Sequence, residues 1–385
     1  MIGARAGTRA GAPALLRPFP GLRYDLAVAG PLGTLLAPPH TELDKVARRA
    51  VLAGSRYAVT HLERPEYRGP ADPADGPAVL SWLGDGALLQ DAPSVYVLSQ
   101  RAGGLEHRFL LAALTVGPDH DHRTLAHEDT IPEALVSRVA RLRATAVDSE
   151  PVLVVATSAG SLGNVLSAPE RHGHLVVDGS ATGVEVRLWR VDDPTVLAEL
   201  QRSTGDAHLL IADGHHRYAA VRRMAQESGH DEQVLVAVAD QATHPVDLVA
   251  LHRVLPGDHA VDVALAAGRV RRVPEDGARK LAADLTAHEF LVVAGDDAFV
   301  VVGDGPDVGG RVDARLSALG VDPGRIRYVA DPDEVWRHRS AGTIVLMPRP
   351  EIDSVLAWAR SGRLMGRKTT SFRPKPLAGA VLRLR

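Results

Sequence analysis

The stretch AHLLIA at residues 207–212, followed by DGHHRY at residues 213–218, indicates the fold of this chain. The largely apolar first half predicts a buried β-strand, and the AAVRRM that follows at residues 219–224 predicts a helix. The polar residues between them therefore lie at a turn that leads from a strand into a helix. Repeated units of this kind are typical of a mixed α/β (α+β) fold.

This turn carries side chains that suit an anion. The first amides of a helix have no partner within the helix, and the macrodipole places partial positive charge at the same end. Gly214 lets a ligand approach the backbone, and the planar guanidinium of Arg217 can bind two phosphate oxygens at once. A structural interpretation stays open, in which Asp213 only caps the helix and His215 and His216 are surface donors. The density of polar groups favours a binding site.

Length, charge and composition limit the class of protein. A chain of 385 residues is long enough for about two domains. The net charge of −3 argues against a surface devoted to nucleic acid or to an anionic membrane. The absence of cysteine excludes disulfides and thiolate chemistry, and no apolar run reaches the roughly 18 to 20 residues of a membrane span. We therefore expect a cytoplasmic protein that binds neither nucleic acid nor membrane.

Strand-like and helix-like patterns alternate along the rest of the chain. Helices are predicted at residues 41–53, 77–83, 132–143, 194–202, 260–268, 278–286 and 333–338. Strands are predicted at residues 56–62, 94–99, 107–114, 152–156, 183–191, 234–240, 248–255, 288–294, 298–302, 325–329 and 343–347, with a glycine-rich turn at 303–310. The Pro-Gly-Asp at residues 256–258 predicts a boundary. We expect a flexible tail (1–15), a catalytic domain (16–256) and a smaller α/β domain (257–385) with a basic C-terminal segment.

Several polar motifs at the ends of predicted elements are further candidates for a site. Glu63 and Arg64 follow a predicted strand and are either part of a site or a solvated ion pair. Glu128 is suited to act as a base or a magnesium ligand, unless it merely precedes the helix at 132–143. The DHDH run at residues 119–122 has metal-binding side chains, but no predicted element holds it, which favours a solvated loop.

Two basic motifs come later in the chain. Lys368 and Lys375 lie in a basic segment stiffened by proline, where they either reach back to phosphates or, as is commoner, stay solvated. His252 and Arg253, on their own, are more typical of polar residues on a strand face than of ligands.

Taken together, these motifs resemble the bacterial and archaeal domain-of-unknown-function family ten-fifteen. The resemblance runs from the Arg-Pro-Phe at residues 17–19 to the basic C-terminal segment. It is carried by the motifs HLERP (61–65), HE (127–128), ADGHHRY (212–218), HR (252–253) and FRPKP (372–376).

The resemblance implies a ParB/sulfiredoxin-like core that binds nucleotide phosphates. It also implies an activity similar to that of the free-serine kinases, which move a phosphoryl group from a nucleotide to the hydroxyl of L-serine, with ATP and Mg²⁺ as cofactors. Phosphoryl transfer needs positioning and charge neutralisation more than covalent chemistry. The residues implied in phosphate binding are Gly214, His215, Arg217, Arg253, Lys368 and Lys375. The residues implied in catalysis are Glu63, Glu128, Asp213 and His216, with Glu63 or Glu128 as the base and Asp213 also as a metal ligand.

The chain departs from the family pattern at two places. It has Pro38-Pro39-His40-Thr41 where the family tends to carry Pro-Pro-Tyr-Asp, and Asp129 where a basic residue is usual. A lost cation removes a phosphate contact, so either the substrate differs or the activity has changed. Two other functions stay open: a nucleotide-binding regulatory module without turnover, and a histidine-based metal hydrolase. Neither the acceptor nor the oligomeric state follows from the sequence.

Overall fold

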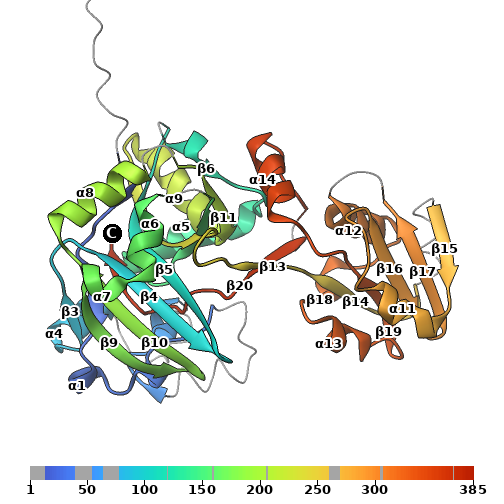
Figure 1. The fold of residues 1–385 in the computed structure, drawn as a ribbon, viewed down its shortest axis with the longest axis horizontal. Helices are drawn as coiled ribbons and strands as arrows, with labels where there is room; N and C mark the ends of the chain where they lie inside the picture. Colours follow the sequence, from blue (N-terminus) through green and yellow to red (C-terminus); the bar gives the residue numbers. More distant parts are fainter. Residues whose placement is uncertain are drawn as a thin grey trace, which may run out of the picture. The chain divides into compact units, whose positions relative to one another are not determined.

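The computed structural model describes residues 14–39, 54–63, 78–118, 120–157, 160–204, 207–259, 269–303, 307–366 and 368–385. The fold is mixed α/β, as predicted (Figure 1). The chain divides into two compact units: unit 1 contains residues 1–124, 131–246 and 375–385, and unit 2 contains residues 125–130 and 247–374. The boundary predicted at residues 256–258 falls inside unit 2. The assignment of residues 16–256 to one catalytic domain stays a prediction.

Unit 1 is built on a nine-stranded sheet with the order β6-β11-β8-β12-β5-β4-β10-β9, and β1 pairs with β5. The strands are β1 (Leu16–Arg17), β4 (Val95–Ala102), β5 (Leu105–Val116), β6 (Thr124–Leu125), β8 (Val152–Ala156), β9 (His174–Ala181), β10 (Val184–Val191), β11 (Leu209–Asp213) and β12 (Glu232–Asp240). Strand β8 is 0% exposed along its whole length, which explains its unbroken apolar sequence. It pairs in parallel with β12 and antiparallel with β11.

Helices pack onto this sheet where the sequence predicts amphipathic segments. Helix α9 (His215–Ser228) contacts β5, β8 and β12, and α5 (Pro132–Thr145) packs against α9. Helix α6 (Ser161–Ser167) contacts β5, α7 (Pro169–His172) and α8 (Pro194–Ser203). The strand–turn–helix unit predicted at residues 207–224 is therefore confirmed as β11 followed by α9.

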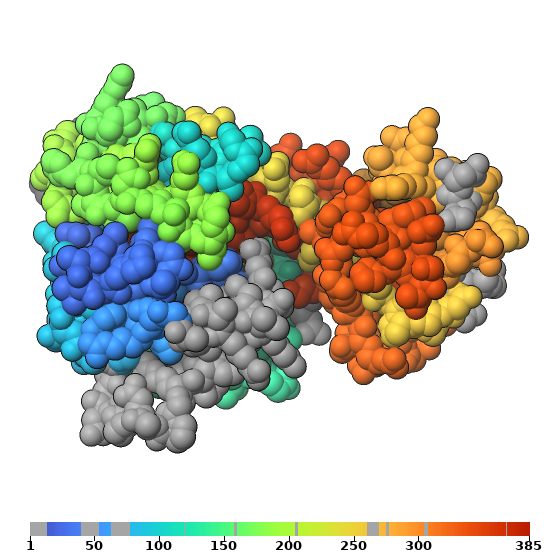
Figure 2. Space-filling view, turned by 90° about the horizontal axis from the view of Figure 1, so that it is seen from below, coloured from blue at the N-terminus to red at the C-terminus, as the bar shows by residue number. Residues whose placement is uncertain are grey.

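A smaller sheet joins the two ends of the chain within unit 1. Its order is β3-β2-β21-β7. The strands are β2 (Gly21–Tyr24), β3 (Leu88–Gln90), β7 (Val147–Asp148) and β21 (Leu382–Leu384), and the short helices nearby in sequence are α1 (Leu26–Ala29), α3 (Thr60–Glu63) and α4 (Ala78–Gly84). The 3-10 helix η1 (Leu32–Thr34) packs against β9, and Figure 2 shows the blue N-terminal segment in contact with green residues from the middle of the chain.

Unit 2 is an antiparallel six-stranded sheet with helices on both faces, in the order β15-β17-β16-β19-β14-β18. Its strands are β14 (His252–Pro256), β15 (Arg269–Val273), β16 (Glu289–Ala294), β17 (Asp297–Val302), β18 (Arg327–Val329) and β19 (Gly342–Leu346). Its helices are α11 (Glu275–Leu281), α12 (Val308–Ala318), α13 (Pro332–Trp336) and α14 (Ile352–Arg360), and a separate ribbon pairs β13 (Asp247–Ala250) with β20 (Thr370–Arg373).

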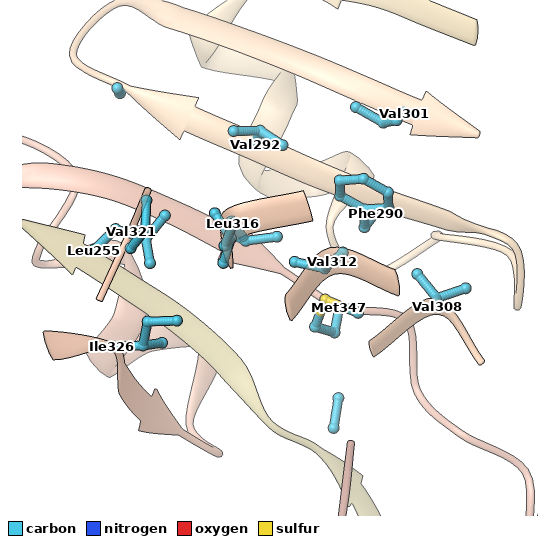
Figure 3. Close-up of a cluster of buried hydrophobic side chains, with 13 residues drawn as sticks. Leu255, Phe290, Val292, Val301, Val308, Val312, Leu316, Val321, Ile326 and Met347 are labelled. Atoms are coloured by element: carbon cyan, nitrogen blue, oxygen red, sulfur yellow. The ribbon is translucent and has the colours of Figure 1, made fainter. Parts of the chain in front are cut away.

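Strand β16 shows why the sheet of unit 2 is covered by helices on both faces. Phe290 and Val292 belong to one core cluster, which includes Val312 and Leu316 of α12 (Figure 3). Leu291 and Val293, the alternate residues of the same strand, belong to a second cluster, to which α11 and α13 contribute. Alternate side chains of a strand point to opposite faces, so a strand with a core on each side is apolar throughout.

Some predicted elements are wrong or lie outside the described residues. The strand predicted at 56–62 is a turn followed by α3, and the strand predicted at 248–255 is two strands, β13 and β14, in different sheets. The turn predicted at 303–310 ends early, because the Asp307 side chain caps α12 at its start. The helices predicted at 41–53 and 260–268 lie outside the described residues. None of the described helices has the length and apolar character to cross a membrane.

Candidate functional site

Asp213, at the end of β11, binds two cations of unit 1. Its Oδ1 accepts a hydrogen bond from Lys375 Nζ at 2.5 Å, and its Oδ2 accepts one from Arg217 Nη2 at 2.7 Å. The side chains of Lys375 and Arg217 are only 11% and 9% exposed. Charge-assisted hydrogen bonds are strong when water is largely excluded. The fold thus brings together two predicted site residues that lie 162 positions apart.

A second carboxylate completes this arrangement, which we call the Asp213 cluster (Glu150, Asp213, Arg217 and Lys375). Arg217 Nη1 lies 2.8 Å from Glu150 Oε1, and the Glu150 side chain is 3% exposed. Strand β11 runs antiparallel to β8, with Asp213 opposite Leu153, so the end of β11 lies beside the residues that precede β8. The cluster holds two positive and two negative side chains and is balanced in charge.

Gly214 shapes the turn between Asp213 and helix α9. Its φ of +92° lies in the left-handed region, and it is the N-cap residue with no side chain to accept a hydrogen bond from the first turn. A Cβ at this position would lie 2.9 Å from Nε and Nη2 of Arg217. The glycine is therefore needed both for the backbone conformation and for the position of Arg217. His215 is buried and His216 half-buried in the first turn of this 14-residue helix.

Gln100 positions the segment that carries Lys375. Its Nε2 donates a hydrogen bond to the Lys375 carbonyl at 3.1 Å, and its Oε1 accepts one from the Leu377 amide at 2.7 Å. Gln100 lies on β4 and is 5% exposed, so water does not compete with these bonds. Neither Gln100 nor Glu150 was predicted from the sequence. The available signals were an amide in the polar second half of strand β4 and an acid just before a buried strand.

The His127-Glu128 motif lies in unit 2, beside the basic C-terminal segment. His127 is 1% exposed, its Nε2 is 3.0 Å from Thr370 Oγ1, and its ring contacts Phe372 edge-on with 5.9 Å between centroids. Glu128 is half-buried and forms a parallel β-bridge with Met365. Two motifs used for the family resemblance are therefore neighbours in this unit.

Arg253 is fully buried and ion-paired. It is 0% exposed, and its Nε and Nη2 donate to both oxygens of Asp313 at 2.9 and 3.0 Å. It also donates to the carbonyls of Leu251 and Gly309. These bonds hold β14 and α12 together. The phosphate-binding role that the resemblance implies for Arg253 stays a prediction.

The other predicted residues have simpler surroundings. Lys368 is exposed, and no ion pair joins it to another residue in the described ranges. Glu63 is the last residue of α3, and its side chain lies outside the described part of the structure. The solvated loop predicted at 119–122 is wrong for His120, which is 1% exposed with its Nε2 3.6 Å from Asp231.

The metal-ligand role that the resemblance implies for Asp213 stays a prediction. Each of its oxygens accepts one hydrogen bond from a cation. Across the described ranges, no group of three or more histidine, aspartate or glutamate side chains has an arrangement that could hold a metal ion. The hypothesis of a histidine-based metal hydrolase therefore has no support in the described residues.

Several solved structures are similar to part of this chain. A mutant of a free serine kinase in complex with ADP is 16% identical with a TM-score of 0.42, covering 68% of this chain and 87% of its own. A conserved hypothetical protein from Pyrococcus furiosus is 14% identical with a TM-score of 0.40, covering 69% and 91%. SbnI with a C-terminal truncation from Staphylococcus aureus is 12% identical with a TM-score of 0.42, covering 69% and 85%. A likeness of this size does not assign an activity.

Family membership rests on the sequence instead. The comparison with curated proteins finds no match. The model of the family described as "Protein of unknown function (DUF1015)" matches residues 16–319, which is most of the chain and includes the Asp213–Arg217 turn. The chain therefore belongs to the DUF1015 family.

Proposed function

We propose that unit 1 binds the phosphates of a nucleotide at the Asp213 cluster. The observation that carries this proposal is the convergence of Lys375 and Arg217 on the two oxygens of one carboxylate at the start of α9. An oxyanion with two oxygens at similar spacing suits the same pair of cations, with the positive end of the helix behind them. Phosphate oxygens have this character, and an arginine fork together with a lysine is a common combination for binding them.

We further propose that the bound nucleotide is ATP and that its γ-phosphoryl group is transferred to the hydroxyl of L-serine. In this reaction the serine oxygen forms a bond to the γ-phosphorus, the bond to the bridging oxygen breaks, and ADP leaves. Lys375 and Arg217 would neutralise charge on the phosphates, which is the main contribution a protein makes to such a transfer. Glu63 at the end of α3, in the same unit, would take the hydroxyl proton. Mg²⁺ would enter with the nucleotide phosphates, and Asp213 is the metal ligand that the family resemblance implies.

Replacing Lys375 with methionine tests the phosphate site. The variant keeps the length of the side chain but removes the charge, so we expect the Kd for ADP and ATP to rise about 10- to 100-fold in isothermal titration calorimetry. Lys280→Met is the matched control, because Lys280 is exposed in unit 2, and its Kd should equal that of the parent protein. Equal nucleotide affinity for the parent and Lys375→Met would refute the site.

Phosphoserine formation tests the reaction separately. The parent protein is incubated with Mg-ATP and L-serine, and phosphoserine and ADP are quantified, with L-threonine and L-homoserine as competing acceptors. Nucleotide binding without phosphoserine would reject the serine assignment and leave the phosphate site intact.

A second candidate function is nucleotide binding without turnover, as in a regulatory module. The observation in its favour is Asp129, an exposed acid directly after Glu128, at a position where the family usually has a positively charged residue. A negative charge at that position repels phosphates. Measurable nucleotide affinity with neither hydrolysis nor transfer across the acceptors would select this function.

A further inference from the structure

The Asp213 cluster contains an anion of its own at the place where we propose that phosphates bind. Lys375 Nζ is 2.5 Å from one oxygen of Asp213, and Arg217 Nη2 is 2.7 Å from the other. The carboxylate presents two oxygens to these cations, as a phosphate does. A phosphate that takes these N–H groups therefore displaces the Asp213 carboxylate from them.

Solvent exposure distinguishes the two carboxylates of the cluster. The side chain of Glu150, which pairs with Arg217 at 2.8 Å, is 3% exposed, whereas that of Asp213 is 23% exposed. A buried carboxylate that loses its cation is left both unpaired and unsolvated, which is strongly unfavourable. A carboxylate with access to water exchanges its cation for water at a much smaller loss. Asp213 is therefore the acid of the cluster that can leave.

Both cations are also held by residues other than Asp213. Gln100 fixes the main chain around Lys375, since it bonds to the Lys375 carbonyl at 3.1 Å and to the Leu377 amide at 2.7 Å. Glu150 pairs with Nη1 of Arg217, the terminal nitrogen that does not bond to Asp213. When Asp213 turns away, these contacts keep both cations near the start of α9, where an incoming phosphate meets them.

We propose that Asp213 is an internal competitor of the phosphate and so sets the affinity of the site. In the free protein its carboxylate occupies Lys375 and Arg217, and an arriving phosphate takes both cations while the carboxylate turns into water. This inference rests on the proposed phosphate site. An internal competitor weakens the binding of every phosphate ligand by the same factor, because only the molecules with released cations bind. An acid that only positioned the cations would strengthen binding instead.

Asp213→Asn tests the sign of the effect, because it removes the competing charge and keeps the size of the side chain. Pyrophosphate and inorganic phosphate are the probes, titrated by calorimetry into the full-length protein in EDTA, so that no metal ion contributes. We expect the Kd of both probes to fall about tenfold in this variant.

Glu227→Gln is the matched control. Glu227 lies at the other end of α9, where its carboxylate accepts hydrogen bonds from Arg223 and Arg143. The substitution thus removes an acid that pairs with two cations of the same unit, outside the Asp213 cluster. The Kd values of this variant should equal those of the parent protein.

Carboxyl labelling of the parent protein tests the displacement without a change at Asp213, and it decides the matter if Asp213→Asn does not fold. A carbodiimide couples glycine ethyl ester to accessible carboxylates, and mass spectrometry measures the extent at each acid. Saturating pyrophosphate should raise the labelling of Asp213 about threefold relative to Glu227, because the released carboxylate turns from 23% exposure into water. A carboxylate that stayed on the cations would be covered by the ligand, and its labelling would fall.

The possible results separate this inference from the proposed function. Absence of binding to the parent and to Asp213→Asn would reject both the phosphate site and the internal competition. Equal or weaker binding to Asp213→Asn than to the parent would leave the phosphate site intact and overturn the competition. A larger gain for pyrophosphate than for phosphate would indicate charge repulsion, which grows with the charge of the ligand, and would overturn displacement. So would a fall in the labelling of Asp213.

Discussion

Gly214 meets two separate requirements at one position. Its φ of +92° disfavours any residue with a Cβ, and the space where that Cβ would stand is filled by the Arg217 guanidinium. In the native structure the guanidinium reaches both Asp213 and Glu150 from this place. The geometry of the Asp213 cluster therefore depends on the glycine beside it.

Gly214→Ala is expected to damage both stability and binding. The left-handed backbone costs about 1 kcal/mol for alanine, and displacement of Arg217 from buried carboxylates adds roughly 1 to 3 kcal/mol. Urea unfolding gives the stability, and calorimetry gives the Kd for ADP. Gly229→Ala is the control, since Gly229 has a φ of +73° at the other end of α9 and open space around its Cβ position. That variant should lose about 1 kcal/mol without a change in Kd. Similar Kd values for both variants would contradict the assigned role of Gly214.

At the scale of an element, β14 illustrates how polar residues are built into a strand. His252 is 7% exposed, and its Nδ1 accepts a hydrogen bond from the Met347 amide at 2.9 Å. The neighbouring Arg253 spans from β14 to Asp313 on α12. Both side chains serve the packing of unit 2, which agrees with the structural role that their position on a strand face predicts.

His252 should make unit 2 sensitive to mild acid. Burial, with a smaller contribution from the Arg253 charge, lowers the pKa of His252 to about 4. The unfolded chain, with an ordinary histidine pKa of about 6.5, binds the proton more tightly than the native state does. The stabilisation is therefore complete above about pH 6.5 and is lost as the pH falls toward 4. Between pH 7.5 and 5 the loss is about 2 kcal/mol.

The measurement is the free energy of unfolding of the parent and of His252→Asn at both pH values. Asparagine keeps an acceptor for the Met347 amide but does not titrate in this range. When the pH is lowered to 5, the free energy of unfolding should fall by about 2 kcal/mol more in the parent than in the variant. An equal loss in both proteins would show that His252 is not the group responsible.

At the scale of the whole molecule, the last eleven residues return the chain to unit 1. Strand β21 pairs with β2 and with β7, and so closes the small sheet with residues from both ends of the sequence. Asp148 holds the C-terminal segment in place. Its carboxylate is 3% exposed and accepts hydrogen bonds from Arg383 and Arg385, both at 2.9 Å, and from the Leu235 amide at 3.1 Å.

Asp148→Asn is expected to destabilise the protein by about 3 kcal/mol, because it leaves the buried Arg383 without a counter-charge and Arg385 with Glu232 alone. Chemical denaturation followed by circular dichroism measures the effect. Asp178→Asn is the control, since Asp178 is 54% exposed and pairs with the solvated Arg187. The free energy of unfolding of this variant should fall by less than about 0.5 kcal/mol. A loss of similar size in the two variants would contradict the anchoring role of Asp148.

Errors in the predicted elements have physical causes. At residues 56–62 the apolar side chains of Ala58, Val59 and Leu62 fit a helical turn as well as a strand, and so short a segment does not distinguish the two periods. At residues 248–255 one apolar run contains two strands of different sheets, and pattern alone does not reveal a change of partner. Strand β9 was not predicted, because its apolar Leu175, Val176 and Val177 are consecutive rather than alternating and Asp178-Gly179-Ser180 follow them.

The sequence by itself determined the buried strands and the turn from β11 into α9. These follow from local chemistry, namely apolar runs, capping residues and a glycine at a left-handed position. Only the tertiary structure decided that Lys375 and Glu150 meet Arg217 and Asp213, and that Asp213 is more exposed to water than Glu150. A hydrophobic pattern determines which face of a strand is buried, but it does not specify which strand lies next to it in the sheet. The partners of a charged side chain therefore depend on strand order and on the path of the returning chain, which no local pattern contains.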